Sequence, residues 1–528
     1  MADKTLKSLN FGGADKYFPL PLVTAADNDK ILSVVNGEWV AAEAPSGGSG
    51  QYVWSKHETE NGKILEYVVG DTESDYPDGG WKDGFWYKLK LAITPYLSFL
   101  GNEDFTLKTN NTAKNWDGIL EYSTDKSTWN AWNGTEISSS DSKLYLRGTG
   151  NTKITGNSKN YRFVFTGTSA LKIACKGNIE NLLDYETVSA GGHPAMANNC
   201  YRYMFNNCTS LTSAPELPAT TLAVYCYQNM FNGCTSLTAA PTLPATTLAN
   251  GCYNSMFYGC TSLTTAPELP ATTLSMGCYQ GMFHGCASLT TAPVLPATTL
   301  AEYCYNNMFH GCTSLTTAPA LPVTTLSYYC YQSMFEGCTA LTTAPALPAT
   351  TLVDQCYYGM FNGCTALTTA PELPATTLSY YCYNSMFRDC TALTTAPALP
   401  ATTLAEYCYS DMFYGCTSLT TAPELPATTL AERCYNQMFY GCTSLTTAPE
   451  LPATTLASRC YQSMLNGCTK IKMSTTKTGK YQTAYRIPKS GTGATATDAL
   501  TDMFANTGGT FTGTPEINTT YYTSNTVV

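Results

Sequence analysis

Residues 200–468 consist of one 26-residue unit that is written eleven times in succession. Every copy begins with a cysteine and carries a second cysteine eight residues later, such as Cys408 and Cys416. A strict period of this length is typical of arrays in which each repeat packs only against its neighbours. More than half of the 528-residue chain is therefore expected to form a solenoid, a succession of stacked repeats.

Apolar residues recur within the unit at intervals of four, as Leu404, Cys408, Met412 and Cys416 illustrate. This spacing, with Phe413 alongside, is typical of one buried face of a helix. The positions that vary among the copies are again about four apart and would lie on the opposite, exposed face. The pattern predicts a helix of about three turns in every repeat.

Residues on either side of this segment fit the ends of a helix. Thr403 and Glu406 have the spacing of an N-terminal capping box, and Gly415 stands where a left-handed C-terminal cap is expected. The segment from Leu419 to Pro426 reads as extended, and its prolines limit the ladder that it can form. Each repeat is thus predicted to be a short strand plus a helix, a unit of the leucine-rich kind.

The two series of cysteines allow three interpretations: zinc ligands, disulfides or free thiols. Zinc is disfavoured because no Cys-x-x-Cys pair occurs and the four histidines are scattered along the chain. A disulfide within a repeat would span two helical turns, about 12 Å of rise, whereas bridged α-carbons lie within roughly 7 Å. Buried free thiols that pack against their copies in the next repeat are the favoured interpretation.

Composition divides the chain, because all seven tryptophans lie before residue 133 and 22 of the 23 cysteines lie in the repeats. Short strands between turn-rich stretches predict small all-β modules, including a β-sandwich, in the first part. We therefore expect a multidomain protein with these parts: an N-terminal segment and linker (1–50), a small β module (51–95), a β-sandwich-like domain and transition (96–192), an α/β repeat solenoid (193–470), and an insertion with a C-terminal cap (471–528).

Two segments border the repeats. Residues 178–184 have the composition of a short helix. After the last repeat, a polar insertion (472–497) interrupts the pattern, which returns once in residues 499–517 with Ala499 and Thr507 in place of the two cysteines. A last repeat with polar substitutions suits the end of an open core, so a degenerate capping repeat is predicted there.

Charge and hydropathy argue against two kinds of partner. The formal net charge is −10 and no long run of Lys or Arg occurs, which disfavours nucleic acid and anionic membranes. No apolar run approaches the roughly 20 residues needed to cross a bilayer. The first residues lack the apolar stretch of a secretory signal, so the chain is expected to be made in a cytoplasm and not exported by the usual route.

Catalytic and metal sites find little support in the sequence. An acidic loop from Asp71 to Asp83 raises the question of calcium, but the Asp-x-Asp-x-Asp-Gly order is missing and a solvated loop is favoured. The repeats carry no recurrent set of acid, base and nucleophile, and no HExxH, GxSxG or P-loop motif stands out elsewhere. We therefore predict no catalytic residue, no metal and no cofactor.

The Met-Phe-x-Gly-Cys-Thr-Ser-Leu-Thr core of the unit resembles the BspA-like leucine-rich repeats over residues 200–470. This resemblance implies a leucine-rich-repeat fold and a place among bacterial surface adhesins and related surface and phage proteins. The present unit, with 26 residues and Cys-Tyr-x-x before Met-Phe, departs from the shorter form of that repeat.

Segments of the N-terminal part, in residues 26–40, 52–56 and 67–87, look like parts of phage and prophage tail-fibre proteins of gut bacteria. This second resemblance implies a virion tail protein, assembled in the host cytoplasm and released by lysis, which accounts for the missing export signal. It also implies that residues 1–50 attach to other tail proteins and that the chain forms a homotrimer through its N-terminal part, as fibres commonly do.

The exposed face expected for the repeats is rich in Tyr, together with Asn, Gln, Ser and Gly. This composition is typical of binding surfaces, because Tyr offers a large rigid contact area and Asn or Ser offers adaptable hydrogen bonds. Tyrosine can also stack on the faces of sugars. The constant face should form the core, with Cys408, Met412, Phe413, Cys416 and Leu419. We predict a recognition surface that comprises Tyr303, Tyr328, Tyr329, Tyr358, Tyr380, Tyr381, Glu406, Tyr407, Tyr414, Arg433 and Tyr440.

Three functions are compatible with these features. The favoured hypothesis is a phage tail-fibre or tail-tip adhesin that binds a glycan or protein receptor on the bacterial surface. The alternatives are a BspA-like adhesin on the bacterial cell surface itself, and a purely structural fibre component whose tyrosines only solubilise it.

Overall fold

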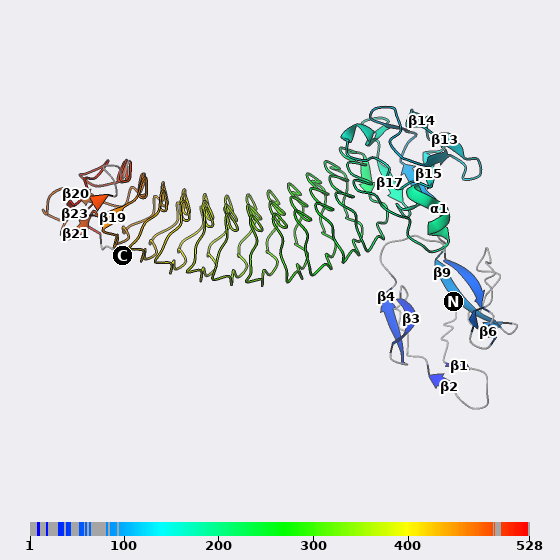
Figure 1. The fold of residues 1–528 in the computed structure, drawn as a ribbon, viewed down its shortest axis with the longest axis horizontal. Helices are drawn as coiled ribbons and strands as arrows, with labels where there is room; N and C mark the ends of the chain where they lie inside the picture. The colour runs from blue at the N-terminus through cyan, green and yellow to red at the C-terminus, as the bar shows by residue number, and fades with distance from the viewer. Residues whose placement is uncertain are drawn as a thin grey trace, which may run out of the picture. The chain divides into compact units, whose positions relative to one another are not determined.

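The computed structural model in Figure 1 describes residues 94–488 and 498–525, and elsewhere only the backbone of short strands. The chain divides into two compact units, Met1–Ile93 and Thr94–Val528. The acidic loop considered for calcium and the linker before residue 51 lie outside the described residues.

The first unit contains short antiparallel strands. β1 pairs with β2, β3 with β4 and β6 with β7, while β9 lies between β5 and β8. Their bounds are β1 (Ser8–Asn10), β2 (Tyr17–Pro19), β3 (Lys30–Val35), β4 (Glu38–Glu43), β5 (Tyr52–His57), β6 (Thr59–Glu60), β7 (Lys63–Ile64), β8 (Trp81–Lys82) and β9 (Phe85–Leu91).

The second unit begins with two sheets that face each other. One has the strand order β13-β12-β15-β10-β17-β18 and the other β14-β11-β16. Phe99 of β10 meets Phe165 of β16 across the sheets, with ring centroids 5.2 Å apart, and Trp116 stacks on Trp132 at 5.1 Å in the same core. The strands are β10 (Leu97–Gly101), β11 (Thr106–Thr109), β12 (Ile119–Ser123), β13 (Asn130–Trp132), β14 (Ile137–Ser138), β15 (Lys143–Thr149), β16 (Phe163–Thr166) and β17 (Ile173–Lys176), with β18 in the first repeat.

One α-helix, α1 (Asn181–Ser189), precedes the repeats. The sequence predicts it over 178–184, whereas it begins at Asn181 and is interrupted at Asp184, which has a non-helical φ of −157°. Gly148 of β15 allows the start of the helix to pack closely, because a β-carbon there would lie 1.8 Å from the Leu182 carbonyl oxygen.

Each repeat forms one coil, and the coils stand side by side in sequence order (Figure 1). None of the eleven repeats, all of which the structure describes, contains an α-helix, so the predicted helix is wrong. Every fourth residue of this segment is left-handed, as at Tyr407 (φ 56°), Asp411 (φ 56°) and Gly415 (φ 72°), whereas a helix needs φ near −63° throughout. The segment is a series of tight turns whose period of four resembles the helical period of 3.6 over a short stretch.

Hydrogen bonds from these turns alternate between the next coil and their own. The Tyr201 N–H donates to the Cys226 carbonyl of the following coil at 2.9 Å, whereas the Met204 N–H donates back to the Tyr201 carbonyl at 3.1 Å. The same alternation recurs from coil to coil. Backbone pairing between coils therefore runs along the turn side of the array.

The extended side of each coil forms little ladder, in keeping with its prolines. Neighbouring coils share isolated parallel bridges there, such as Thr265 with Thr291. Threonine hydroxyls add further bonds between coils, since Thr264 Oγ1 donates to the Thr238 carbonyl at 3.3 Å. Because proline has no N–H to donate, these hydroxyls supply part of the missing pairing.

Two ladders of stacked rings fill the core of the array. Tyr409 stacks on Tyr435 with centroids 5.9 Å apart, and Phe413 stacks on Phe439 at 5.6 Å. The side chains expected in the core are fully buried: Cys408, Met412, Phe413, Cys416 and Leu419. The constant positions of the repeat therefore make one continuous interior.

All 23 cysteines are free and buried. Cys416 Sγ donates to the Phe387 carbonyl of the preceding coil at 3.0 Å, and burial raises the pKa of the Cys416 thiol well above its usual range. The free-thiol interpretation is confirmed. Helical rise is not the reason that disulfides are absent, because this segment consists of turns.

Strand β16 closes the N-terminal end of the array. Its Phe163 substitutes for a repeat phenylalanine, because its N–H donates to the Met204 carbonyl at 2.7 Å and its carbonyl accepts from Cys208 Sγ at 3.3 Å. β17 pairs in parallel with β18 (Leu211–Ser213), so the larger sheet continues into the first repeat.

A further coil and a small sheet close the C-terminal end. Residues 498–507 form this coil and accept backbone hydrogen bonds from the eleventh repeat in the same alternating pattern that joins the repeats. The buried ring of Phe504 is covered by Tyr485 and Tyr521. The sheet has the order β20-β23-β21 and draws on the polar insertion and the chain end. The strands of this region are β19 (Thr455–Leu456), β20 (Met473–Ser474), β21 (Thr483–Arg486), β22 (Ser490–Gly491) and β23 (Thr520–Thr523).

Gly281 distinguishes the turns from a helix. We expect Gly281→Ala to lower the free energy of unfolding by about 1 kcal/mol, because a left-handed alanine is strained and Gly281 has a φ of 59°. Inside a helix the same change would raise stability by roughly 0.5–1 kcal/mol. Gly281→Asn is the matched control, since Asn307 holds the same place one coil later with a φ of 54°. A gain in stability of Gly281→Ala in urea unfolding would contradict the turn backbone.

Candidate binding surface

Equivalent side chains of successive coils lie next to one another, so each turn position forms a row along the array. The first-turn row holds left-handed residues whose rings stack. Tyr303 stacks on Tyr329 at 4.5 Å, and Tyr381 stacks on Tyr407 at 4.3 Å. A ring face that covers a neighbouring ring is not available to a ligand. The row comprises Tyr303, Tyr329, Gln355, Tyr381, Tyr407 and Arg433.

Two arginines cover tyrosine faces in the same way. The Arg433 guanidinium lies 5.1 Å from the Tyr407 ring centre and donates to the Tyr407 hydroxyl. Arg388 lies 4.1 Å over the ring of Tyr414, which stacks on Tyr440 at 4.7 Å. Such cation–π contacts are attractive, so both cations are engaged within the protein.

The edge row stands one residue before the first-turn row and is more exposed. Tyr328 is 48% exposed and Tyr380 is 40% exposed, which separates them from the stacked tyrosines of the first-turn row. The Tyr380 ring is inclined by 80° to that of Tyr381 and by 77° to that of Tyr407. It therefore stands steeply inclined to both rings of that stacked pair. We use the name edge row for its part from Glu302 to Glu432, which comprises Glu302, Tyr328, Asp354, Tyr380, Glu406 and Glu432; Met276 precedes this part and is 43% exposed.

The eleven predicted binding residues differ in how much of their surface is exposed. Tyr328, Tyr380 and Glu406 are exposed on the edge row, whereas the other eight are only partly exposed. Tyr358 stands apart from both rows, with its ring 6.1 Å from that of Tyr381. The predicted residues thus share one side of the coils, but most of their rings are turned toward each other.

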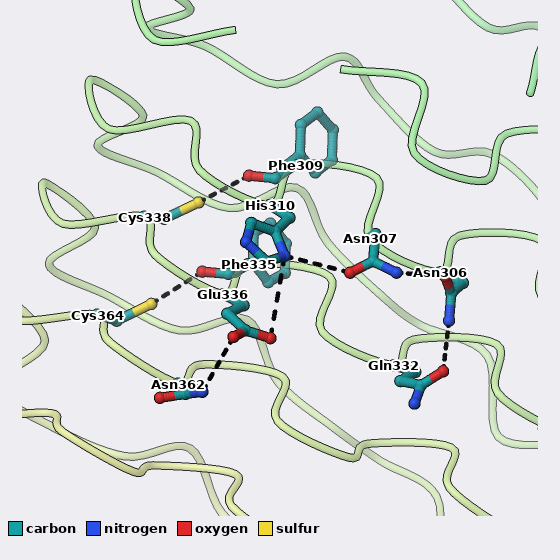
Figure 2. Close-up of polar contacts among 10 residues, drawn as sticks. All are labelled: Asn306, Asn307, Phe309, His310, Gln332, Phe335, Glu336, Cys338, Asn362 and Cys364. Carbon is teal, nitrogen blue, oxygen red and sulfur yellow. Dashed lines mark hydrogen bonds and ion pairs between the residues drawn. The ribbon is translucent and has the colours of Figure 1, made fainter. Parts of the chain in front are cut away.

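An amide row, which the sequence prediction did not recognise, runs beside these tyrosines. Gln228 Nε2 donates to Asn254 Oδ1 at 3.2 Å. Farther along, Asn306 Nδ2 donates to Gln332 Oε1 at 2.6 Å (Figure 2). Amides inside such a ladder both donate and accept, as Asn254 does, whose Nδ2 donates to Gln280 Oε1 at 2.8 Å. The alternation of Gln and Asn every 26 residues was the signal in the sequence. The row comprises Gln228, Asn254, Gln280, Asn306 and Gln332.

A row that we call the histidine row occupies the last turn and runs through Tyr258, His284, His310, Glu336 and Asn362. Figure 2 shows the last three of these residues. Tyr258 stacks on His284 at 4.4 Å, and His284 stacks on His310 at 4.3 Å. His310 Nδ1 lies 3.9 Å from Glu336 Oε2, and the other Glu336 oxygen accepts from Asn362 Nδ2 at 3.1 Å. Burial, and then the neighbouring His310, lower the pKa of His284 to about 4. His284 is therefore neutral at pH 7.

The description of the histidines as scattered is wrong for His284 and His310. They are 26 residues apart and so occupy the same position in adjacent repeats. Within the described part of the chain, no group of three or more His, Cys, Asp or Glu side chains is placed to hold a metal ion.

The repeats identify the family of the chain. The family model described as BspA type Leucine rich repeat region matches residues 198–342, 306–446 and 386–484, with 6 copies. These matches span more than half of the sequence. The chain belongs to the BspA-type leucine-rich repeat family. No curated protein matches it.

Membership in the BspA-type family suggests a surface adhesin or a role in protein interaction. In this BspA-type chain the repeat is made of turns, and its exposed side chains vary from coil to coil. Among the described residues no helix is long and apolar enough to cross a membrane.

The histidine row should make the stability of the array depend on pH. His284 takes up its proton only near pH 4 in the folded chain, whereas an unfolded histidine does so near 6.5. The unfolded state binds more protons in this interval, so stability present at neutral pH is lost as pH falls from about 6.5 toward about 4. The groups that face His284 are Tyr258 and His310.

We expect His284→Asn to reduce the fall in the thermal midpoint of unfolding between about pH 7.5 and about pH 5. Asparagine suits the position, since Asn232 and Asn362 hold it in other coils. Glu336→Gln is the control variant, because it removes the carboxylate beside His310 and leaves His284 in place. An equal fall in the wild type and in His284→Asn would contradict this role of the row.

Proposed function

We propose that this BspA-type repeat protein is a phage tail-fibre or tail-tip adhesin that recognises a structure on the bacterial cell surface. The observation that carries the proposal is the edge row, where exposed tyrosines and carboxylates vary on a backbone that is otherwise constant. Tyrosine is enriched among the residues that dominate binding energy at interfaces. An array that only spaces other parts has no need of large exposed rings at changing positions.

The N-terminal part supports the assignment to a phage tail. Its short motifs resemble those of tail-fibre proteins. We propose that residues 1–50 attach to other tail proteins, that the chain is a homotrimer, and that it is assembled in the host cytoplasm as part of the virion. On this proposal the protein has no enzymatic activity and no cofactor, and binds neither nucleic acid nor membrane.

A bacterial surface adhesin is the second candidate. It is favoured by membership in the BspA-type family, whose repeats resemble those of bacterial surface proteins. Detection of the chain in purified virions, with an antibody raised against residues 193–470, separates the two candidates. Label on cell envelopes and none on particles would overturn the phage assignment.

Binding of the full-length protein to whole gut bacteria tests recognition. We expect saturable binding to some strains, weakened roughly tenfold or more by Tyr328→Ser combined with Tyr380→Ser, because loss of an aromatic anchor commonly costs more than 1 kcal/mol. The matched control is Tyr414→Ser with Tyr440→Ser, which removes a stacked pair and should leave binding nearly unchanged.

Two results would contradict the recognition surface. One is the absence of saturable binding to every strain, which would leave the purely structural fibre component. The other is an equal effect of the two double variants, which would assign their losses to general damage to the array.

A further inference from the structure

We propose that the edge row binds a linear polysaccharide of neutral or amine-bearing pyranose sugars and rejects anionic polymers. This inference rests on the proposed function and names the class of its ligand. The residues that carry it are Glu302, Tyr328, Asp354, Tyr380 and Glu406.

Most tyrosines of the turn side have at least one ring face covered by a neighbouring side chain. Tyr303 and Tyr329 cover each other, as do Tyr381 and Tyr407. Arg433 then covers Tyr407 from the next coil. A pyranose needs an uncovered ring face on which to place its C–H groups, so stacking leaves these rings with less surface for a sugar.

Tyr328 and Tyr380 meet that need. Among the described residues, Tyr328 stacks on no other ring, and Tyr380 touches Tyr381 and Tyr407 only at a steep angle. The stacked pair fixes the Tyr380 ring from one side, while 40% of that residue stays exposed. Because the ring is already held in place, less conformational entropy is lost when a ligand binds its exposed surface.

The spacing of the two rings suits an extended chain of sugars. Tyr328 and Tyr380 stand two coils apart, about 10 Å at the usual separation of paired strands. Asp354 lies between them on the same row, and Ser379 donates to its carboxylate. Two platforms with a hydrogen-bonding group between them can hold two separate rings of one linear sugar chain.

Charge along the edge row selects the kind of polysaccharide. Glu302 and Glu406 are exposed on either side of the tyrosines. Arg433, which follows Glu432 of the row in sequence, is engaged with Tyr407 and with Glu432, whose carboxylate lies 3.8 Å away. The field along the row is therefore negative, which repels carboxylated or phosphorylated polymers and favours hydroxyl or amine donors.

The backbone of the row disfavours a peptide ligand. A peptide that adds a strand needs free N–H and C=O groups at an edge. Here the Tyr328 carbonyl accepts from the Tyr303 N–H at 3.1 Å, and the Tyr380 carbonyl accepts from the Gln355 N–H at 3.0 Å. Side chains must supply the recognition, as is suitable for a glycan.

The test uses full-length protein on a strain that it binds. The surface polysaccharides of that strain are separated by anion exchange into an unretained, neutral or cationic fraction and a retained, anionic fraction. We expect the unretained fraction to compete for binding, and periodate, which cleaves vicinal diols of sugars, to abolish binding to the cells. Protease treatment of the cells should leave binding intact.

Variants connect this result to the edge row. Tyr328→Ser with Tyr380→Ser should weaken binding of the unretained fraction by roughly tenfold or more, and Tyr414→Ser with Tyr440→Ser should not. Competition by the anionic fraction alone, or binding that survives periodate and is lost with protease, would overturn the glycan inference while the adhesin proposal stands. Failure of the protein to bind any cells would overturn both.

Discussion

No coil of this array can pair all of its backbone N–H groups with its own carbonyl groups. The left-handed residue at every fourth position keeps the turns from becoming a helix, and it leaves half of the N–H groups donating to the coil that follows. Buried backbone groups are costly when unpaired, so no coil is stable alone and both ends must be covered. Phe163 covers one end, and the sheet around Phe504 covers the other.

The same pairing brings equivalent residues together at one coil spacing, inside and outside the array. In the interior this produces the continuous ladders of Tyr, Phe and Cys. On the surface it makes neighbouring side chains partners of each other, as in the amide row and the stacked tyrosines. Exposed recognition is left to the residues that point away from these stacks. The edge row is thus a consequence of the backbone, and its alternation of Tyr with carboxylates gives it chemical character.

The sequence allowed part of this to be predicted. Its period gave the number and order of the coils, and the constant apolar positions are the ones buried, such as Met412 and Phe413. It did not reveal that the period of four arises from turns, because four residues and 3.6 residues per turn differ little over a dozen positions. Gly281 and Gly359 in mid-segment were the overlooked signs of a left-handed backbone. The pairing of His284 with His310, and of one tyrosine with the next, required neighbouring coils to be compared position by position.

The turn backbone exposes the tyrosines of the edge row and shields those of the first-turn row. Hydroxyl-radical footprinting of the native protein, read residue by residue by mass spectrometry, tests it directly. We expect rapid labelling of Tyr328 and Tyr380, slower labelling of Tyr329 and Tyr381, and full protection of the buried ladder residues such as Tyr409. Equal labelling of Tyr328 with Tyr329, and of Tyr380 with Tyr381, would contradict it.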